Sequence, residues 1–294
     1  MTQTGELLRK VRRLEIRSRH LVEDLFAGQS ESVFKGRGVE FEDVRHYVPG
    51  DEVRDIDWNV TARFGAPFVK RFAEEHELTV LLVVDVSRSM RFGTAGSEKR
   101  ELAAELCAVL GFAAMQHNDR VGLVLAGQRV EHFVPPARGR THLLRMLRDV
   151  LGFESRSVAT GLSEAARFLL RTTRRRSLVF WISDFEDPID VRDFRALGRR
   201  HELTALLLRD PRDETLPVVG WVEIEDLESG WRELVNTSSR RVREAYGREA
   251  RDRRRTAERA LSRVRCPVVE LRTDRSYLPA LMRYFAARNR GRAR

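Results

Sequence analysis

One buried strand that ends in an aspartate constrains the fold of this chain more than any other feature. Residues 78–84 are a continuous run of leucine, threonine and valine with no polar face, which is typical of a parallel strand covered by helices on both sides. Asp85 ends the run, and Ser87 and Ser89 follow at alternate positions. Ligands of open α/β sheets bind just beyond the carboxyl ends of strands. The sequence therefore predicts a site of oxygen-bearing side chains at this edge.

The rest of the chain alternates between strand-like and helix-like segments. Four later apolar runs predict strands at 120–127, 177–184, 203–210 and 268–272. Apolar residues at helical spacing predict helices at 97–117, 142–151, 162–171, 188–199 and 277–287, and a serine-capped, arginine-rich helix that reaches about residue 265. Residues 128–135 alternate between polar and apolar, as an edge strand does. Strands separated by helices predict an α/β fold with a doubly wound, mostly parallel sheet.

Changes in composition and hydrophobic pattern divide the chain into four parts. Residues 1–28 hold an amphipathic helix, whose apolar stripe we expect to dock on the protein itself. Residues 29–77 form short strand-like pieces broken by turns, which predict a small β-rich segment. Residues 78–288 form the α/β domain, with an insertion at about 211–236 containing a short strand, and residues 289–294 form a basic tail.

The small segment contains an unusually dense mixture of carboxylates, arginines and a tryptophan at residues 53–63. Two interpretations are open. The segment is a recognition surface that uses Asp57, Trp58 and Arg63 to bind a partner, or Trp58 is an anchor that packs this piece against the larger domain. The anchor is the favoured interpretation.

The formal net charge of +10 invites a nucleic-acid function. Only four of the 54 cationic residues are lysines, however, so the charge is better explained by a bias toward arginine codons than by a phosphate-binding surface. A basic surface equally suits an acidic protein partner. No apolar run approaches the roughly 18 residues of a membrane span, and the first residues lack the regions of a signal peptide. We therefore expect a cytoplasmic protein without membrane insertion.

Two predicted strands end in aspartates, Asp85 and Asp184, which meet at one sheet edge if the strands are neighbours. Carboxylates and hydroxyls without histidine or cysteine favour Mg²⁺, Mn²⁺ or Ca²⁺ over zinc. Because these protein ligands are few, water or another protein's carboxylate must complete the shell, which favours Mg²⁺. An acidic group from a neighbouring copy can fill the same position, so self-association is a further expectation.

These residues also carry a family resemblance. The run from Asp85 to Ser89 (Asp-Val-Ser-Arg-Ser), followed by a helix, a threonine and a second aspartate, resembles the metal-ion-dependent adhesion site (MIDAS) of von Willebrand factor type A (vWA) domains. The upstream Pro-Gly-Asp at 49–51 and Asp-Trp at 57–58 are similar to the signature of the DUF58 family, and the resemblance spans roughly residues 30–290. It implies a vWA-like, Rossmann-like fold.

The resemblance also implies a complete set of metal ligands. The set comprises Asp85, Ser87, Ser89, Thr160 and Asp184. Thr160 is preferred to Thr141, which we expect to cap a helix, and Asp184 is expected to act through water. A simple helix cap is the alternative role for the two serines.

The function implied by the resemblance is binding rather than turnover. DUF58 proteins are commonly associated with MoxR-type AAA+ ATPases in the assembly or maturation of other proteins. The chain is then expected to be the non-enzymatic adaptor, which binds the ATPase and an acidic protein ligand. It has no Walker motif of its own, because Lys99 of the glycine-bearing loop is followed by arginine.

Two other classes of function compete with this one. A Mg²⁺-dependent phosphohydrolase of the haloacid dehalogenase type also has a strand that ends in aspartate, but it needs a second carboxylic acid two residues later, where this chain has Ser87. A nucleic-acid-binding protein would use the arginines of 171–176 and 251–255, of which the second group reads as the solvated face of a helix.

Overall fold

The computed structural model describes residues 3–26, 40–49, 51–52, 56–73, 78–94, 97–155, 161–225 and 231–292. The chain forms two compact units. The small unit is Phe34–Leu78, and the large unit consists of Met1–Val33 together with Thr79–Arg294. The N-terminal segment therefore belongs with the α/β part of the chain.

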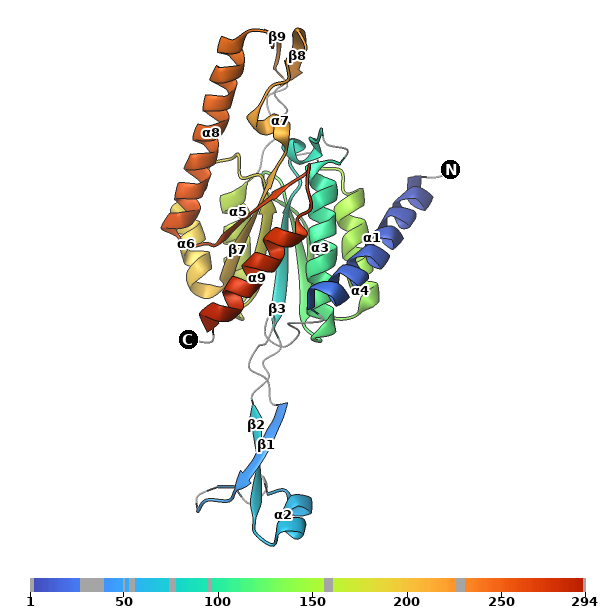
Figure 1. Cartoon of the computed structure of the whole chain (residues 1–294), viewed down its shortest axis with the longest axis vertical. Coiled ribbons are helices and arrows are strands. Elements are labelled where there is room, and N and C mark those ends of the chain that lie inside the picture. The colour runs from blue at the N-terminus through green and yellow to red at the C-terminus, as the bar shows by residue number, and fades with distance from the viewer. Residues whose placement is uncertain are drawn as a thin grey trace. The chain divides into compact units, whose positions relative to one another are not determined.

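A six-stranded sheet forms the centre of the large unit (Figure 1). Its strands, in chain order, are β3 (Thr79–Asp85), β4 (Arg120–Ala126), β5 (Val130–Ala137), β6 (Leu178–Ser183), β7 (Glu202–Arg209) and β10 (Val268–Arg272). In space the order is β10-β7-β6-β3-β4-β5, and every neighbouring pair is parallel except β4 with β5. The predicted α/β fold with a mostly parallel sheet and one antiparallel edge strand is confirmed.

Helices cover both faces of this sheet. On one face α1 (Gln3–Phe26), α3 (Lys99–Gln116) and α4 (Arg140–Gly152) contact one another. On the other lie α5 (Leu162–Thr172), α6 (Val191–Arg200) and α8 (Arg240–Arg263). Helix α9 (Leu278–Arg292) packs the rings of Tyr284 and Phe285 edge-on against Phe180 of β6, so most of the predicted basic tail is helical.

The docking predicted for the N-terminal helix is confirmed. Val11 and Val22 of α1 are buried, and Arg17 pairs with Glu105 of α3 at 2.9 Å. Among the described helices, none is long and apolar enough to cross a membrane.

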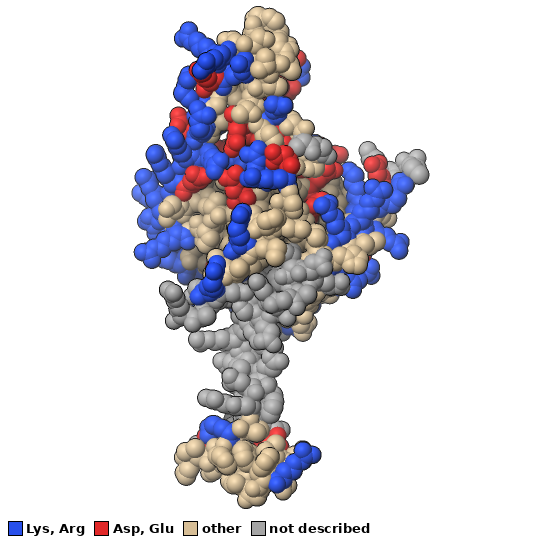
Figure 2. All heavy atoms as spheres, in the orientation of Figure 1, with Lys and Arg blue, Asp and Glu red and all other residues tan. Residues whose placement is uncertain are grey.

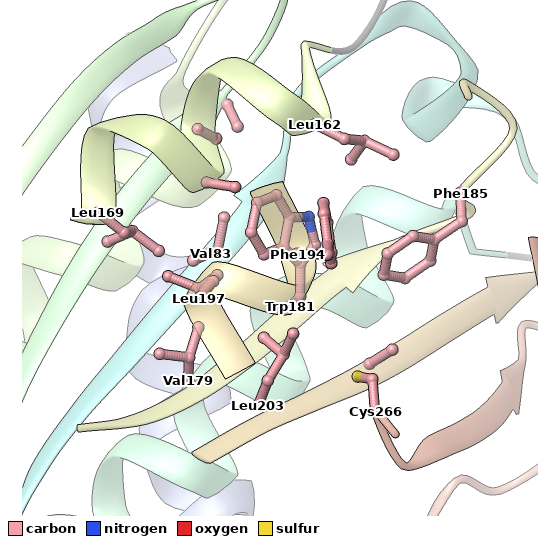
Figure 3. Packing of buried hydrophobic residues seen from close by; sticks show 14 of the residues in the cluster. Val83, Leu162, Leu169, Val179, Trp181, Phe185, Phe194, Leu197, Leu203 and Cys266 are labelled. Atoms are coloured by element: carbon pink, nitrogen blue, oxygen red, sulfur yellow. The ribbon is translucent and has the colours of Figure 1, made fainter. Parts of the chain in front are cut away.

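The core under α5 and α6 is built from alternate residues of the strands (Figure 3). Because side chains alternate across a strand, Val83, Val179 and Trp181 point to this face. The ring of Trp181 lies 4.7 Å from that of Phe194 on α6, centroid to centroid. This packing holds β3 and β6 side by side, with all of β6 and every residue of β3 after Thr79 buried, which fixes the register of their carboxyl ends.

The small unit has two antiparallel strands, β1 (Glu40–His46) and β2 (Phe68–Ala73), and a helix, α2 (Trp58–Phe64). The helix was not predicted within the β-rich segment 29–77. Its start and stop follow the usual rules, because the side chain of Asp57 accepts hydrogen bonds from two backbone amides of the first turn and Gly65 ends it with a φ of 70°.

The predicted insertion contains a short helix, α7 (Pro211–Glu214), and an antiparallel hairpin of β8 (Trp221–Glu225) and β9 (Arg232–Asn236). The second strand was not predicted. Ser239 occupies the predicted cap position of α8, but its side chain does not make the hydrogen bond that was expected of a cap. Thr237 instead holds the base of the hairpin, because its Oγ1 donates to the carbonyl of Gly220 and accepts from the amide of Val219.

Candidate functional site

The carboxyl end of β3 places Asp85 in a fully buried position next to β6. Its Oδ1 accepts a hydrogen bond from the amide of Ser87 at 2.8 Å, and its Oδ2 accepts one from the hydroxyl of Ser183 at 2.6 Å. Ser183 is the last residue of β6 and was not predicted as a site residue. Its position directly before Asp184, at the end of a buried run, is the signal that points to it.

Ser87 and Ser89, which follow Asp85 in the chain, lie next to each other. The hydroxyls of Ser87 and Ser89 are 3.0 Å apart, and Ser89 in turn hydrogen bonds to Asp184. Ser87 precedes a short 3₁₀ helix, Arg88–Arg91, but its side chain makes no capping hydrogen bond. The structure therefore does not support the alternative that Ser87 is a simple cap. A chain of oxygen atoms runs from Asp85 through both serines to Asp184.

A buried lysine faces the same cluster. The Nζ of Lys99, the first residue of α3, lies 3.0 Å from Asp184 Oδ2 and 2.9 Å from Asp213 Oδ2 on α7. Burial opposes the charge of Lys99, but Asp184 and Asp213 raise its pKa above the usual value, so the ammonium stays protonated. The sequence offered one signal for this role, since Lys99 is one of only four lysines in an arginine-rich chain.

The two aspartates of the cluster titrate in opposite directions. Burial, and then the charge of Asp184, raise the pKa of Asp85 to about 6. Burial alone would raise the pKa of Asp184 too, but Lys99 overcomes it and lowers that pKa below its usual value. Glu186 lies nearby, and burial together with Asp184 raises its pKa. Lys99 is not the only cation beside these carboxylates, because Arg209 lies 3.9 Å from Glu186 and helps to lower the pKa of Asp184.

A third aspartate that follows a strand, Asp210 after β7, has a structural role. It is fully buried and accepts hydrogen bonds from the amide and hydroxyl of Thr94 and from the hydroxyl of Thr273. These contacts lower its pKa against the effect of burial. Asp210 therefore ties the loop after the 3₁₀ helix to the ends of β7 and β10, and its oxygens are already engaged.

The remaining predicted ligand, Thr160, lies outside the described residues. Its neighbour Gly161 donates a hydrogen bond to the carbonyl of Gly127, at the turn between β4 and β5. A Cβ at Gly161 would lie 2.0 Å from the carbonyl oxygen of Gln128, so only glycine allows this approach. The alternative, Thr141, is not the cap that was predicted for it, because the cap position of α4 is Gly139.

We expect Gly161→Ala to lower the free energy of unfolding by about 2 kcal/mol, because an added methyl group meets backbone that cannot move aside easily. Gly198→Ala is the matched control, since its new Cβ would have no neighbour closer than 3.7 Å and alanine favours the helix it occupies. Urea unfolding of both variants measures the difference. Equal stabilities would show that the close approach at Gly161 does not constrain the chain.

The three residues of the small unit that were predicted to bind a partner all belong to α2 or its cap, but they differ in exposure. Asp57 caps α2 with its side chain, whereas Trp58 and Arg63 are exposed on that helix. Trp58 is 64% exposed within the small unit, so it does not pack into the core of that unit. Its interpretation as an anchor for the larger domain stays a prediction, as does its role in binding a partner together with Arg63.

The cluster at the sheet edge can be tested for its fit to a metal ion. Among the described residues, no group of three or more His, Cys, Asp or Glu side chains is arranged to hold one. The donors that do converge are the carboxylates of Asp85 and Asp184 and the hydroxyls of Ser87 and Ser89. Such hard oxygen donors suit Mg²⁺ or Mn²⁺ if water or a further ligand completes the shell.

The fold and this site define the class of the protein as an α/β protein with a buried cluster of oxygen donors at the carboxyl edge of a mostly parallel sheet. Residues 43–256 match the family described as "Protein of unknown function DUF58". The chain belongs to this DUF58 family, as its sequence resemblance predicted.

Relatives of similar length occur in mycobacteria. The chain is 37% identical over 290 residues to the uncharacterized protein Rv1480 of Mycobacterium tuberculosis, covering 97% of this chain and 91% of the relative. The uncharacterized protein Mb1516 of Mycobacterium bovis matches equally. Among solved structures, the PilB minor pilin of Streptococcus sanguinis is similar at 11% identity and a TM-score of 0.37, covering 77% of this chain and 65% of the pilin.

Proposed function

We propose that this protein is a non-enzymatic, metal-dependent adaptor for protein interactions. In this proposal the large unit is a vWA-like domain whose MIDAS-like site uses Asp85, Ser87, Ser89 and Asp184, with Thr160 as the fifth ligand. The observation that carries the proposal is the run of oxygen atoms from Asp85 through the two serines to Asp184, at the edge where β3 and β6 end together. Mg²⁺ is the preferred ion, with Mn²⁺ and Ca²⁺ as alternatives.

The protein's own residues have separate tasks in this site. Ser183 orients the Asp85 carboxylate through a 2.6 Å hydrogen bond, and Lys99 holds Asp184. A metal held by these residues would bind a carboxylate oxygen of an acidic partner. The position two residues after Asp85 is a serine, which lacks the acid group that a phosphohydrolase of the alternative type requires. This chemistry favours capture of a ligand over its hydrolysis.

The proposed partner is a MoxR-type AAA+ ATPase, with an acidic protein as the captured ligand. The resemblance described above implies this pairing, and it gains support from the membership of the chain in the DUF58 family. The exposed Trp58 and Arg63 of α2, in the small unit, are a candidate contact for the ATPase.

A direct test measures Mn²⁺ binding by electron paramagnetic resonance. The double variant Ser87→Ala, Ser89→Ala removes two proposed ligands while Asp85 keeps its bonds to Ser183 and to the amide of residue 87. We expect its affinity for Mn²⁺ to fall at least about tenfold. Ser262→Ala, which changes an exposed serine of α8, is the matched control.

The same proteins then serve in a pull-down with the MoxR-type ATPase and with acidic ligands, with and without chelator. Loss of ligand capture in the double variant and in chelator supports the adaptor function. Mn²⁺ binding that is equal in all three proteins would contradict the metal site. Turnover of phosphate esters that depends on Asp85 would contradict the assignment as a non-enzyme.

A further inference from the structure

The hairpin in the insertion exposes a concentrated apolar surface. Five large side chains within residues 218–234 are each more than 60% exposed, and they are Val218, Val219, Trp221, Trp231 and Leu234. β8 and β9 lie at one end of the large unit in Figure 1, and Figure 2 shows an uncharged area at that end. Each tryptophan alone presents roughly 100 Å² or more to solvent. Patches of this kind mark contacts with other molecules.

One face of the hairpin combines apolar and acidic groups. Because side chains alternate, Trp221, Glu223 and Glu225 of β8 point to the same side. On β9, Leu234 lies opposite Glu223 and Arg232 lies opposite Glu225, so both belong to that side as well. Arg232 pairs with Glu225 at 2.9 Å and with Glu223 at 3.9 Å, which leaves the face with one net negative charge and partly exposed glutamates. We call this the hairpin face. A two-stranded hairpin is only marginally stable by itself, so a covering surface would stabilise it.

A basic surface lies beside the hairpin on the same unit. Helix α8 holds ten arginines and four carboxylates, and Figure 2 shows cationic groups next to the uncharged area at this end of the unit. Arg241 and Arg248 are exposed and seven residues apart, which places them on one side of the helix. Among the described residues neither forms an ion pair. The described hairpin strands, in contrast, carry three glutamates and one arginine.

We propose that the hairpin face docks on a second copy of this chain. About a two-fold axis, Trp221 and Leu234 of both copies pack together, and Glu223 and Glu225 of each copy meet Arg241 and Arg248 on α8 of the other. A two-fold arrangement uses every contact twice, which enlarges a small patch into a larger interface. The glutamates among the tryptophans disfavour an anionic membrane as the occupant, because they would face lipid headgroups of like charge. This contact does not depend on the proposed metal site.

Charge exchange between copies gives a decisive test by analytical ultracentrifugation. The hairpin variant carries Glu223→Arg and Glu225→Arg, and the helix variant carries Arg241→Glu and Arg248→Glu. Each variant alone is expected to be monomeric, since both contacts of its dimer become repulsive. An equimolar mixture is expected to dimerise, because each reversed hairpin then faces a reversed helix. Arg259→Glu with Arg263→Glu, at the far end of α8, is the control that keeps the dimer.

A second variant separates docking from folding. Trp221→Ser with Leu234→Ser is expected to weaken the dimer at least about tenfold without changing the circular dichroism spectrum, because both side chains are exposed. Wild-type protein that stays monomeric up to about 100 µM, or a mixture that fails to dimerise, overturns the proposal. Monomeric protein that co-sediments with phosphatidylglycerol vesicles through these residues assigns the face to a membrane and overturns it too.

Discussion

Replacing Lys99 with methionine is expected to lower the free energy of unfolding by about 3 to 5 kcal/mol. Lys99 is 1% exposed and is the ammonium between Asp184, itself nearly fully buried, and Asp213. Methionine fills similar space, so the loss comes from leaving the carboxylates of Asp184 and Asp213 without the ammonium that pairs with them. Urea unfolding monitored by circular dichroism measures the change.

Two further proteins separate charge from packing in this experiment. Lys10→Met removes an exposed pair with Glu101 at 3.3 Å and is expected to cost less than about 1 kcal/mol. Adding Asp184→Asn to Lys99→Met removes one of the uncompensated charges and is expected to recover part of the lost stability. Equal costs for Lys99→Met and Lys10→Met would contradict a structural role for the buried ammonium.

The sequence predicted the part of the fold that depends on local pattern. Continuous apolar runs ending in Asp85 and Asp184 identified two strands that the structure pairs in parallel, and the alternating run before Pro135 identified the antiparallel edge. Asp57 and Gly65 are ordinary signals for the start and end of a helix. These two signals are sufficient to predict α2. The helix was nevertheless not predicted, because the segment was interpreted from its aromatic and carboxylate residues instead.

The contacts of the site could not be predicted in the same way, because they depend on strand order. Ser183 reaches Asp85 across 98 positions of the chain only because β6 lies next to β3. The buried Lys99 joins residues that follow β6 and β7, which no local pattern relates. The residues next to a lysine in the sequence do not show whether its ammonium is buried between carboxylates or exposed. The sequence therefore predicted the ligating groups but not the charges that tune them.

The stability of the protein is expected to fall as pH rises from about 4 to 7, through the titration of Asp85. The folded pKa of about 6 lies above the reference value of 3.8. The stability that the protonated group contributes is therefore fully present below pH 3.8 and is lost as pH rises through about 6, a difference of about 3 kcal/mol. Asp85→Asn removes the charge, so this variant is expected to be more stable than wild type at pH 7.5 and similar at pH 4.

Asp184→Asn is the matched control with the opposite sign. Lys99 lowers the pKa of Asp184, so its ionised form stabilises the fold above the reference value of 3.8, and this contribution is lost as pH falls through the lower folded pKa. Its replacement leaves Lys99 with Asp213 as its remaining close carboxylate and is expected to destabilise the protein at pH 7.5. Urea unfolding of both variants, in chelator, from pH 4 to 8 distinguishes the two aspartates. If both substitutions change stability in the same direction at pH 7.5, the carboxyls do not have the opposite electrostatic roles inferred from their surroundings.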